Sequence, residues 1–103
     1  MPHPSAVAAA ADRIEAELRR LGWWSAAPLL PEQYAFHQAF AMDTMAFSQW
    51  LQFVFLPRVR DAVASGEFPP GSMVAAQAMR EFDGQEEAGP LISRLSAFDA
   101  LFG

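Results

Sequence analysis

The chain contains no cysteine and no lysine, and it has only two histidines. Without cysteine there can be no disulfide framework and no thiolate metal site, and a reducing compartment is compatible with the composition. No His-x-x-x-His pair and no cluster of acidic residues takes the place of a cysteine-based site, so we expect neither a metal nor another cofactor. A nucleophile with a base beside it and a phosphate-binding loop are also missing, which argues against catalysis.

The sequence also lacks a long apolar run and an excess of positive charge. The apolar stretch near its middle is interrupted by Ser48, Gln49 and Gln52, so no segment reaches the roughly 18 uncharged apolar residues that a membrane span needs. The small apolar residues of the N-terminus have no basic region ahead of them, unlike a secretory signal. Seven arginines and twelve acidic residues give a net charge of −5, which disfavours nucleic-acid binding. We therefore expect a cytoplasmic protein that binds neither a membrane nor nucleic acid directly.

The chain is rich in apolar residues. Of its 103 residues 52% are hydrophobic, and 13% are aromatic. A chain of this length forms one domain, and this composition supplies a dense core, so we expect a single helical domain over residues 1–103.

Four segments have the periodicity of amphipathic helices, and no alternating strand pattern competes with them. The expected helices are Val7–Leu21 after a Ser5 cap and before Gly22, Asp43 or Thr44 to Ser65 before Gly66, Met73–Phe82 after a Ser72 cap, and a helix that begins at Gly89 and Pro90. The predicted fold class is all-α, as an antiparallel four-helix bundle or a compact helical array.

Pro57 lies inside the second predicted helix, where it removes the hydrogen bond to the Phe53 carbonyl and disfavours a straight helix. The apolar phase changes across it, because Val59 projects to nearly the opposite side from Trp50. The sequence therefore predicts a kink or a local unwinding. The apolar residues of Met45–Leu56 cover an arc of about 200°, wider than a surface helix needs, which indicates the central helix of the fold. A protein interface on part of this arc is the alternative.

Arg58 follows the proline, near the apolar side of the preceding turns. An arginine there is costly unless a carboxylate or carbonyl groups receive its donors, so we expect a structural salt bridge or a capped carbonyl. A functional anion site is the alternative. The candidate partners are Asp43, Asp61, Glu81 and Asp99.

The connection from Gly22 to Met42 carries many large apolar side chains. We expect it to pack over the core as a lid, with one short helical turn at Pro31–Tyr34. Trp23 and Trp24 stand at its start. Adjacent tryptophans most often close a core under a loop, and an exposed recognition site is the alternative.

The polar residues near these apolar surfaces complete the set of site candidates. Asp43 is best explained as a helix cap, and His37 has no partner at metal-ligand spacing. Gln49 and Gln52 mark a narrow polar edge of the second helix. An enzyme would require Asp43, His37 and Arg58 to converge in one cleft. The candidates for interaction or ligand binding are Trp23, Trp24, His37, Asp43, Gln49, Gln52 and Arg58.

Four elements resemble the YqcC-like family of small bacterial proteins. They are FAMDTM at 40–45, WLQFV at 50–54, LPR at 56–58 and LSAFDALF at 95–102. Ala39 departs from the pattern, since the family has a proline there. The resemblance implies an all-α protein of about this length with no assigned activity and no catalytic residues to carry over. It also implies a link to RNA modification, because some members are encoded beside a tRNA pseudouridine synthase.

These observations predict an all-α protein with a proline-kinked second helix that acts as a non-enzymatic accessory or interaction module. The expected partner is another protein, through which the chain would be linked to tRNA pseudouridine modification; self-association is an alternative. The alternative function is binding of a small apolar or anionic ligand. Its pocket would lie between the kinked helix and the aromatic loop, with Arg58 as the polar end.

Overall fold

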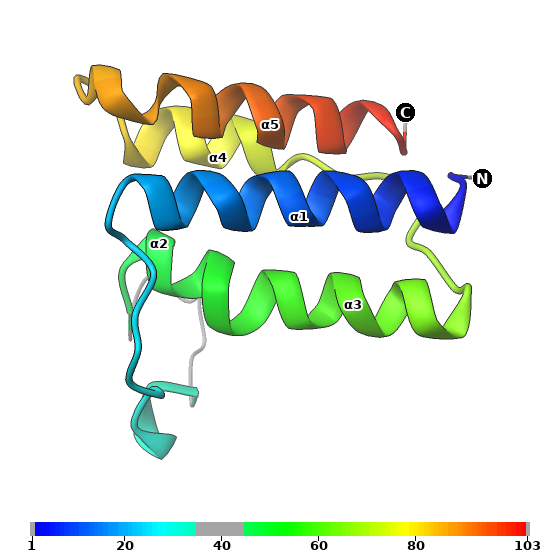
Figure 1. Cartoon of the computed structure of the whole chain (residues 1–103), viewed down its shortest axis with the longest axis horizontal. Helices are drawn as coiled ribbons and strands as arrows, with labels where there is room; N and C mark the ends of the chain where they lie inside the picture. Colours follow the sequence, from blue (N-terminus) through cyan, green and yellow to red (C-terminus); the bar gives the residue numbers. More distant parts are fainter. Residues whose placement is uncertain (1, 35–44, 103) are drawn as a thin grey trace.

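The computed structural model describes residues 2–34 and 45–102, and that part of the chain contains helices and no strand. Figure 1 shows α1 between α5 and α3, with α4 beside α5. The elements are α1 (Pro4–Arg20), the 3₁₀ turn η1 (Pro31–Tyr34), α2 (Phe47–Trp50), the π-helical turn η3 (Leu51–Phe55), α3 (Leu56–Ser65), α4 (Val74–Glu81), the 3₁₀ turn η4 (Glu86–Ala88) and α5 (Gly89–Ala100). The predicted all-α class is confirmed.

α1 begins earlier than Val7, where we expected it. Pro4 occupies the first helical turn, where the missing N–H of proline costs nothing. The Nδ1 atom of His3 accepts a hydrogen bond from the Ser5 N–H at 3.2 Å. His3 therefore caps the helix, and the predicted Ser5 cap is wrong.

α1 also takes the central position that we expected for the Met45–Leu56 segment. It packs against both α3 and α5, and its apolar stripe is buried along its whole length, at Val7, Ala10, Ala11, Ile14 and Leu18. The Met45–Leu56 segment is nevertheless part of the core. Trp50 and Val54 are each 6% exposed, so their predicted burial is confirmed.

Pro57 is accommodated by the π-helical turn η3, directly ahead of it. Over this turn the hydrogen bonds reach one residue further back than in an α-helix, as from the Leu56 N–H to the Leu51 carbonyl. The wider turn relieves the clash between the proline ring and the preceding turn, and it rotates all later residues. Val59 consequently joins Trp50 in the core. The predicted disturbance is confirmed, in the form of a local unwinding.

The predicted end of this helical segment agrees with the structure, but its predicted start does not. It begins at Phe47, where the Gln49 Oε1 atom accepts a hydrogen bond from the Ala46 N–H at 2.9 Å. The predicted start at Asp43 or Thr44 is therefore wrong, and those two residues lie outside the described ones. The end at Ser65 is confirmed, because Gly66 has a φ of 75° and stops the helix.

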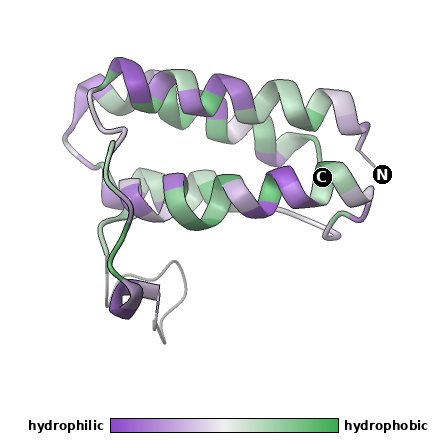
Figure 2. Cartoon of the chain, turned by 60° about the horizontal axis from the view of Figure 1, so that its bottom comes forward, coloured by the Kyte–Doolittle hydropathy of each residue, from purple (hydrophilic) through white to green (hydrophobic). Residues whose placement is uncertain are grey.

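The loop that follows α1 covers the core only in part. The predicted turn at Pro31–Tyr34 is confirmed as η1, and Leu29 is buried. Leu30 and Tyr34 are 59% and 47% exposed. Figure 2 shows η1 standing away from the helices, so the expected lid is wrong for this portion.

The N-terminus of α4 is capped from another helix. Asp99, on α5, accepts hydrogen bonds from the backbone N–H of Val74 at 3.1 Å and of Ala75 at 2.8 Å. The Ser72 hydroxyl donates to the same carboxylate. Ser72 therefore assists the cap but does not supply it, contrary to prediction, and Asp99 ties α4 to α5.

We predict that Asp99→Ala destabilises the domain by about 1–3 kcal/mol, because two backbone donors lose a charged acceptor. Urea denaturation followed by circular dichroism measures the loss. Asp83→Ala, in the exposed turn after α4, is the matched control and should stay within about 0.5 kcal/mol of the wild type. Equal losses in the two variants would contradict the proposed role of the cap.

Candidate functional site

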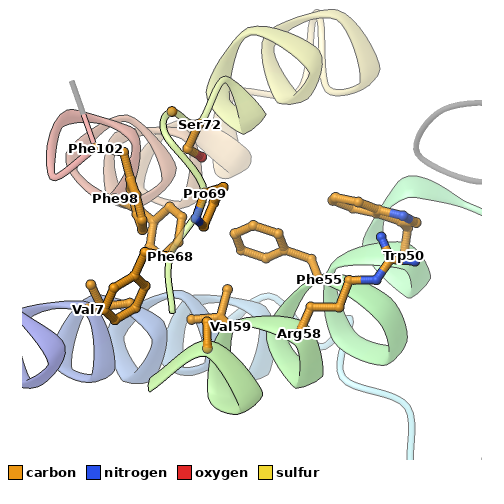
Figure 3. A pocket seen from close by; sticks show the side chains of 12 residues that line it. Val7, Trp50, Phe55, Arg58, Val59, Phe68, Pro69, Ser72, Phe98 and Phe102 are labelled. Atoms are coloured by element: carbon orange, nitrogen blue, oxygen red, sulfur yellow. The ribbon is translucent and has the colours of Figure 1, made fainter. Parts of the chain in front are cut away.

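An apolar pocket of about 200 Å³ lies between α3, the connection from α3 to α4, and α5. Figure 3 shows Phe55, Phe68 and Pro69 directed toward its centre, with Val7 of α1 at one end. The alternative function placed a pocket between the kinked helix and the aromatic loop, whereas this pocket faces the α3–α4 connection. A second hollow, of about 310 Å³, does lie between that helix and the loop, and it is lined by Tyr34, Phe53, Val54, Pro57, Arg58 and Asp61. The residues that line the apolar pocket are Val7, Trp50, Phe55, Arg58, Val59, Ala62, Phe68, Pro69, Gly71, Ser72, Phe98 and Phe102.

The walls of this pocket are held by contacts between aromatic rings. The ring centroids of Phe55 and Phe98 lie 5.1 Å apart in an edge-to-face arrangement. Phe98 and Phe102 are 5.0 Å apart, and Phe68 meets Phe102 at 6.0 Å. Such contacts stabilise beyond simple burial and fix the angle of each ring. The pocket is therefore a defined cavity between packed rings.

The aromatic walls were not among the predicted site residues. The signals for them were present in the sequence, since Phe98 and Phe102 share one helical stripe and Phe68 directly precedes two prolines. Such a stripe by itself indicates a core-facing helix, and a phenylalanine ahead of two prolines indicates a stiff connection. Neither pattern predicts that α5 and the α3–α4 connection leave a cavity between them.

Arg58 is exposed, and it has no ion-pair or hydrogen-bond partner within residues 2–34 and 45–102. The expected structural salt bridge is therefore not found there. Asp99 is engaged at the α4 cap and Glu81 accepts from Gln77 at 3.2 Å, while Asp61 forms no pair with Arg58. The reason is the π turn, which moves Arg58 from the apolar side to its edge. The guanidinium extends along the pocket toward Trp50 (Figure 3).

Gln52 is a buried polar residue with a structural role. Its Oε1 accepts from the Ser25 N–H at 2.8 Å, and its Nε2 donates to the Ser25 carbonyl at 2.8 Å. Both groups of the side-chain amide are thus paired with one backbone residue of the loop after α1. Gln52 is not on a polar edge as predicted, because this loop covers it.

Trp23 and Trp24 follow the α1 C-terminus, and both are half-buried. The Trp23 N–H donates to the Leu18 carbonyl at 2.9 Å, and Gly22 adopts a φ of 75°, which together form a Schellman motif. The Trp23 ring packs 4.9 Å from that of Phe82. The Arg19 guanidinium lies 4.5 Å above the Trp24 ring. Both tryptophans pack against the core, which confirms the interpretation that they close it under the loop.

Of the three remaining candidates, the structure describes only Gln49. Gln49 is used in capping α2. His37 and Asp43 lie outside the described residues, so their convergence with Arg58, which an enzyme would require, is not tested by the structure. Among the residues that the structure describes, no group of three acidic or histidine side chains could hold a metal ion. The helices in the same part of the chain include none that is long and apolar enough to cross a membrane.

Comparison with known proteins gives relatives across almost the whole chain. The family model DUF446, described as tRNA pseudouridine synthase C, matches residues 6–101. An uncharacterized protein of Haemophilus influenzae is 29% identical over 94 residues, which are 87% of this chain and 86% of that protein. The uncharacterized protein YqcC of Escherichia coli is 32% identical over 91 residues, which are 86% of this chain and 84% of YqcC.

A solved structure shows the same arrangement of helices. The solution NMR structure of YqcC from Escherichia coli matches with a TM-score of 0.87 and 29% identity, over 99% of this chain and 89% of that chain. The fold therefore places the chain in the class of small all-α proteins that share this arrangement. The chain belongs to the DUF446 family of YqcC-like proteins.

One further relative matches over a shorter stretch. A tRNA pseudouridine synthase C of Pectobacterium carotovorum is 46% identical to this chain over 48 residues. The stretch is 45% of this chain and 12% of that protein. Most of the named synthase therefore has no counterpart in the alignment.

We predict that Gln52→Leu destabilises the domain by about 1–3 kcal/mol, because the Ser25 N–H and carbonyl lose their partners while the side-chain volume is nearly kept. Hydrogen exchange should locate the effect, with the Ser25 amide exchanging faster than in the wild type. Gln85→Leu, at an exposed glutamine, is the control and should change neither quantity. If the exchange rate of the Ser25 amide were the same in Gln52→Leu as in the wild type, the two hydrogen bonds between Gln52 and Ser25 would not protect the loop.

Proposed function

We propose that the chain is a non-enzymatic accessory that binds a protein of tRNA pseudouridine modification. The observation that carries this proposal is the 48-residue match to a protein named tRNA pseudouridine synthase C, of which it makes up 12%. Two parts that are joined in one protein can also bind each other as separate chains, although they then lose the high effective concentration that the linker provides. The separate chain would then need a contact surface of its own.

The charges on the described surface favour a protein partner over tRNA. The net charge is −5, and several arginines are already neutralised by carboxylates. Such pairs release few counterions from a phosphate backbone, which is the main source of affinity for nucleic acid. The pairs are Arg19 with Glu15 at 3.0 Å, Arg20 with Glu17 at 2.7 Å and Arg60 with Asp12 at 2.8 Å.

The loop after α1 offers an apolar contact surface. Leu30 and Tyr34 are the exposed large residues on it, and Figures 1 and 2 show the segment projecting from the helices. Trp24 lies near its base with Arg19 above the ring. Aromatic residues and arginine are the types that dominate binding energy in interfaces, and projecting apolar groups are costly unless a partner covers them.

The proposal assigns the pseudouridine chemistry to the partner. Cleavage of a glycosidic bond needs an acid or a nucleophile beside the base, and the described residues that line the apolar pocket include no carboxylate and no histidine. The same pocket carries a single positive charge, at Arg58, which is too little to hold a folded RNA.

We predict that the tagged chain captures the tRNA pseudouridine synthase encoded in its own genome, and that Leu30→Ser combined with Tyr34→Ser weakens this binding by at least about tenfold. Biolayer interferometry with the purified synthase measures both. Met73→Ser with Met79→Ser is the matched control, because these two residues are similarly exposed but lie at the start of α4 and on α4, away from η1. No binding by the wild type, or equal loss in both double variants, would refute the proposed surface.

The wild-type chain should not shift tRNA in a gel titration at low salt, because its acidic balance repels the phosphate backbone. Pseudouridine formation by the chain without the synthase should also be absent. Salt-sensitive micromolar binding to tRNA, or pseudouridine formed by the chain alone, would overturn the accessory role.

A further inference from the structure

The pocket between α3, the α3–α4 connection and α5 has the size of a small ligand site. An engineered protein cavity of about 150 Å³ with apolar walls binds benzene, and this pocket has a volume of about 200 Å³. It can therefore hold one benzene-sized group with a short extension. Larger ligands of drug size occupy pockets of roughly 300–1,000 Å³ and do not fit.

The pocket exists because its outer wall cannot collapse onto the inner one. Pro69 and Pro70 restrict the backbone of the connection, and Phe68 is fixed against Phe102 at 6.0 Å. On the opposite side Phe55 is held by Trp50 at 5.5 Å and by Phe98 at 5.1 Å. Phe98 and Phe102 join the two sides at 5.0 Å, so a continuous series of rings encloses the space, and water inside it finds few hydrogen-bond partners.

The charge at the pocket determines which apolar ligand suits it. Among the described residues that line it, Arg58 is the one that is charged, and none of the described residues pairs with its guanidinium. An organic cation would be repelled, and a neutral hydrocarbon would make no use of the guanidinium donors. A free phosphate would find this single arginine and no apolar contact. A planar carboxylate matches the two parallel N–H groups of a guanidinium.

We infer that the pocket binds a small monocarboxylic acid whose apolar part is about the size of a phenyl ring. The apolar part lies between Phe55, Phe68 and Phe98, and the carboxylate meets Arg58 at the exposed end. Most of the affinity therefore comes from burial of the ring, and the exposed ion pair adds the preference for an acid. The inference does not rest on the proposed accessory role, since neither Leu30 nor Tyr34 lines this pocket; among the described residues, Arg58 alone borders both this pocket and the hollow beside Tyr34.

Titration of the full chain with phenylacetate, followed by NMR, tests this site. The matched neutral probe is 2-phenylethanol, which has the same ring and nearly the same length. Phenylacetate should bind with a dissociation constant on the order of 1 mM or below and shift the amides of Phe55, Val59 and Phe98. The alcohol should bind at least about tenfold more weakly, because it cannot form the charged pair.

Two variants separate the charge from the cavity. Arg58→Met should weaken phenylacetate binding by about tenfold or more and leave the affinity for the alcohol within about twofold. It should not change the melting temperature, since Arg58 is exposed. Arg80→Met, at an exposed arginine of α4 outside the pocket, should bind both probes as the wild type does. Ala62→Leu, which adds volume inside the pocket, should weaken both.

Several results would overturn the inference. In the wild type, these are equal affinity for the acid and the alcohol, shifts confined to amides away from the pocket, or no shift up to the solubility limit of the acid. In Arg58→Met, it is an unchanged affinity for the acid. A melting curve for Ala62→Leu that matches the wild type shows that its loss of binding comes from the filled space and not from unfolding.

Discussion

The arrangement of the second helical segment depends on one missing hydrogen-bond donor, the backbone nitrogen of Pro57. A regular helix cannot carry this residue in its interior without losing a bond and straining the preceding turn. The chain instead widens the turn ahead of it, with the Leu56 N–H bonded to the Leu51 carbonyl. The extra residue in this turn rotates the side chains of α3 relative to those of α2. It directs Val59 into the core and leaves Arg58 at the rim of the pocket.

Polar side chains inside the fold act mainly as ties between distant backbone segments. Gln52 pairs with Ser25 in the loop after α1, and Asp99 caps α4 from α5. Each replaces water at backbone groups that would otherwise be left unpaired where the chain is partly buried. The apolar residues supply most of the burial, while these two side chains determine which segments meet. The polar atoms of both side chains are therefore already hydrogen-bonded. Arg58, at the rim of the pocket, has a guanidinium that no described residue engages.

Local signals in the sequence predicted the elements well. Gly22 and Gly66 marked helix ends because a left-handed residue is required there, and the stripe of α5 followed its apolar spacing. Contacts between residues distant in the sequence could not be predicted from such local signals. The cap of α4 comes from residue 99, far along the chain, and the partner of Gln52 lies in a loop. Arg58 was misplaced because its direction was deduced from straight helical geometry, which the π turn changes. The pocket walls were recognised as apolar, but only packing shows where two walls stay apart.

The central position of α1 has a consequence for the order of folding. α4 and α5 are neighbours in the sequence and can pair through a short connection, and Asp99 near the end of α5 then caps the start of α4. α1 instead packs against α5, with most of the chain between them, and against α3. Closing such a long loop has a larger entropic cost than closing a short one. The α4–α5 pair is therefore favoured to form early, and the docking of α1 joins it to α3 in a late, cooperative step.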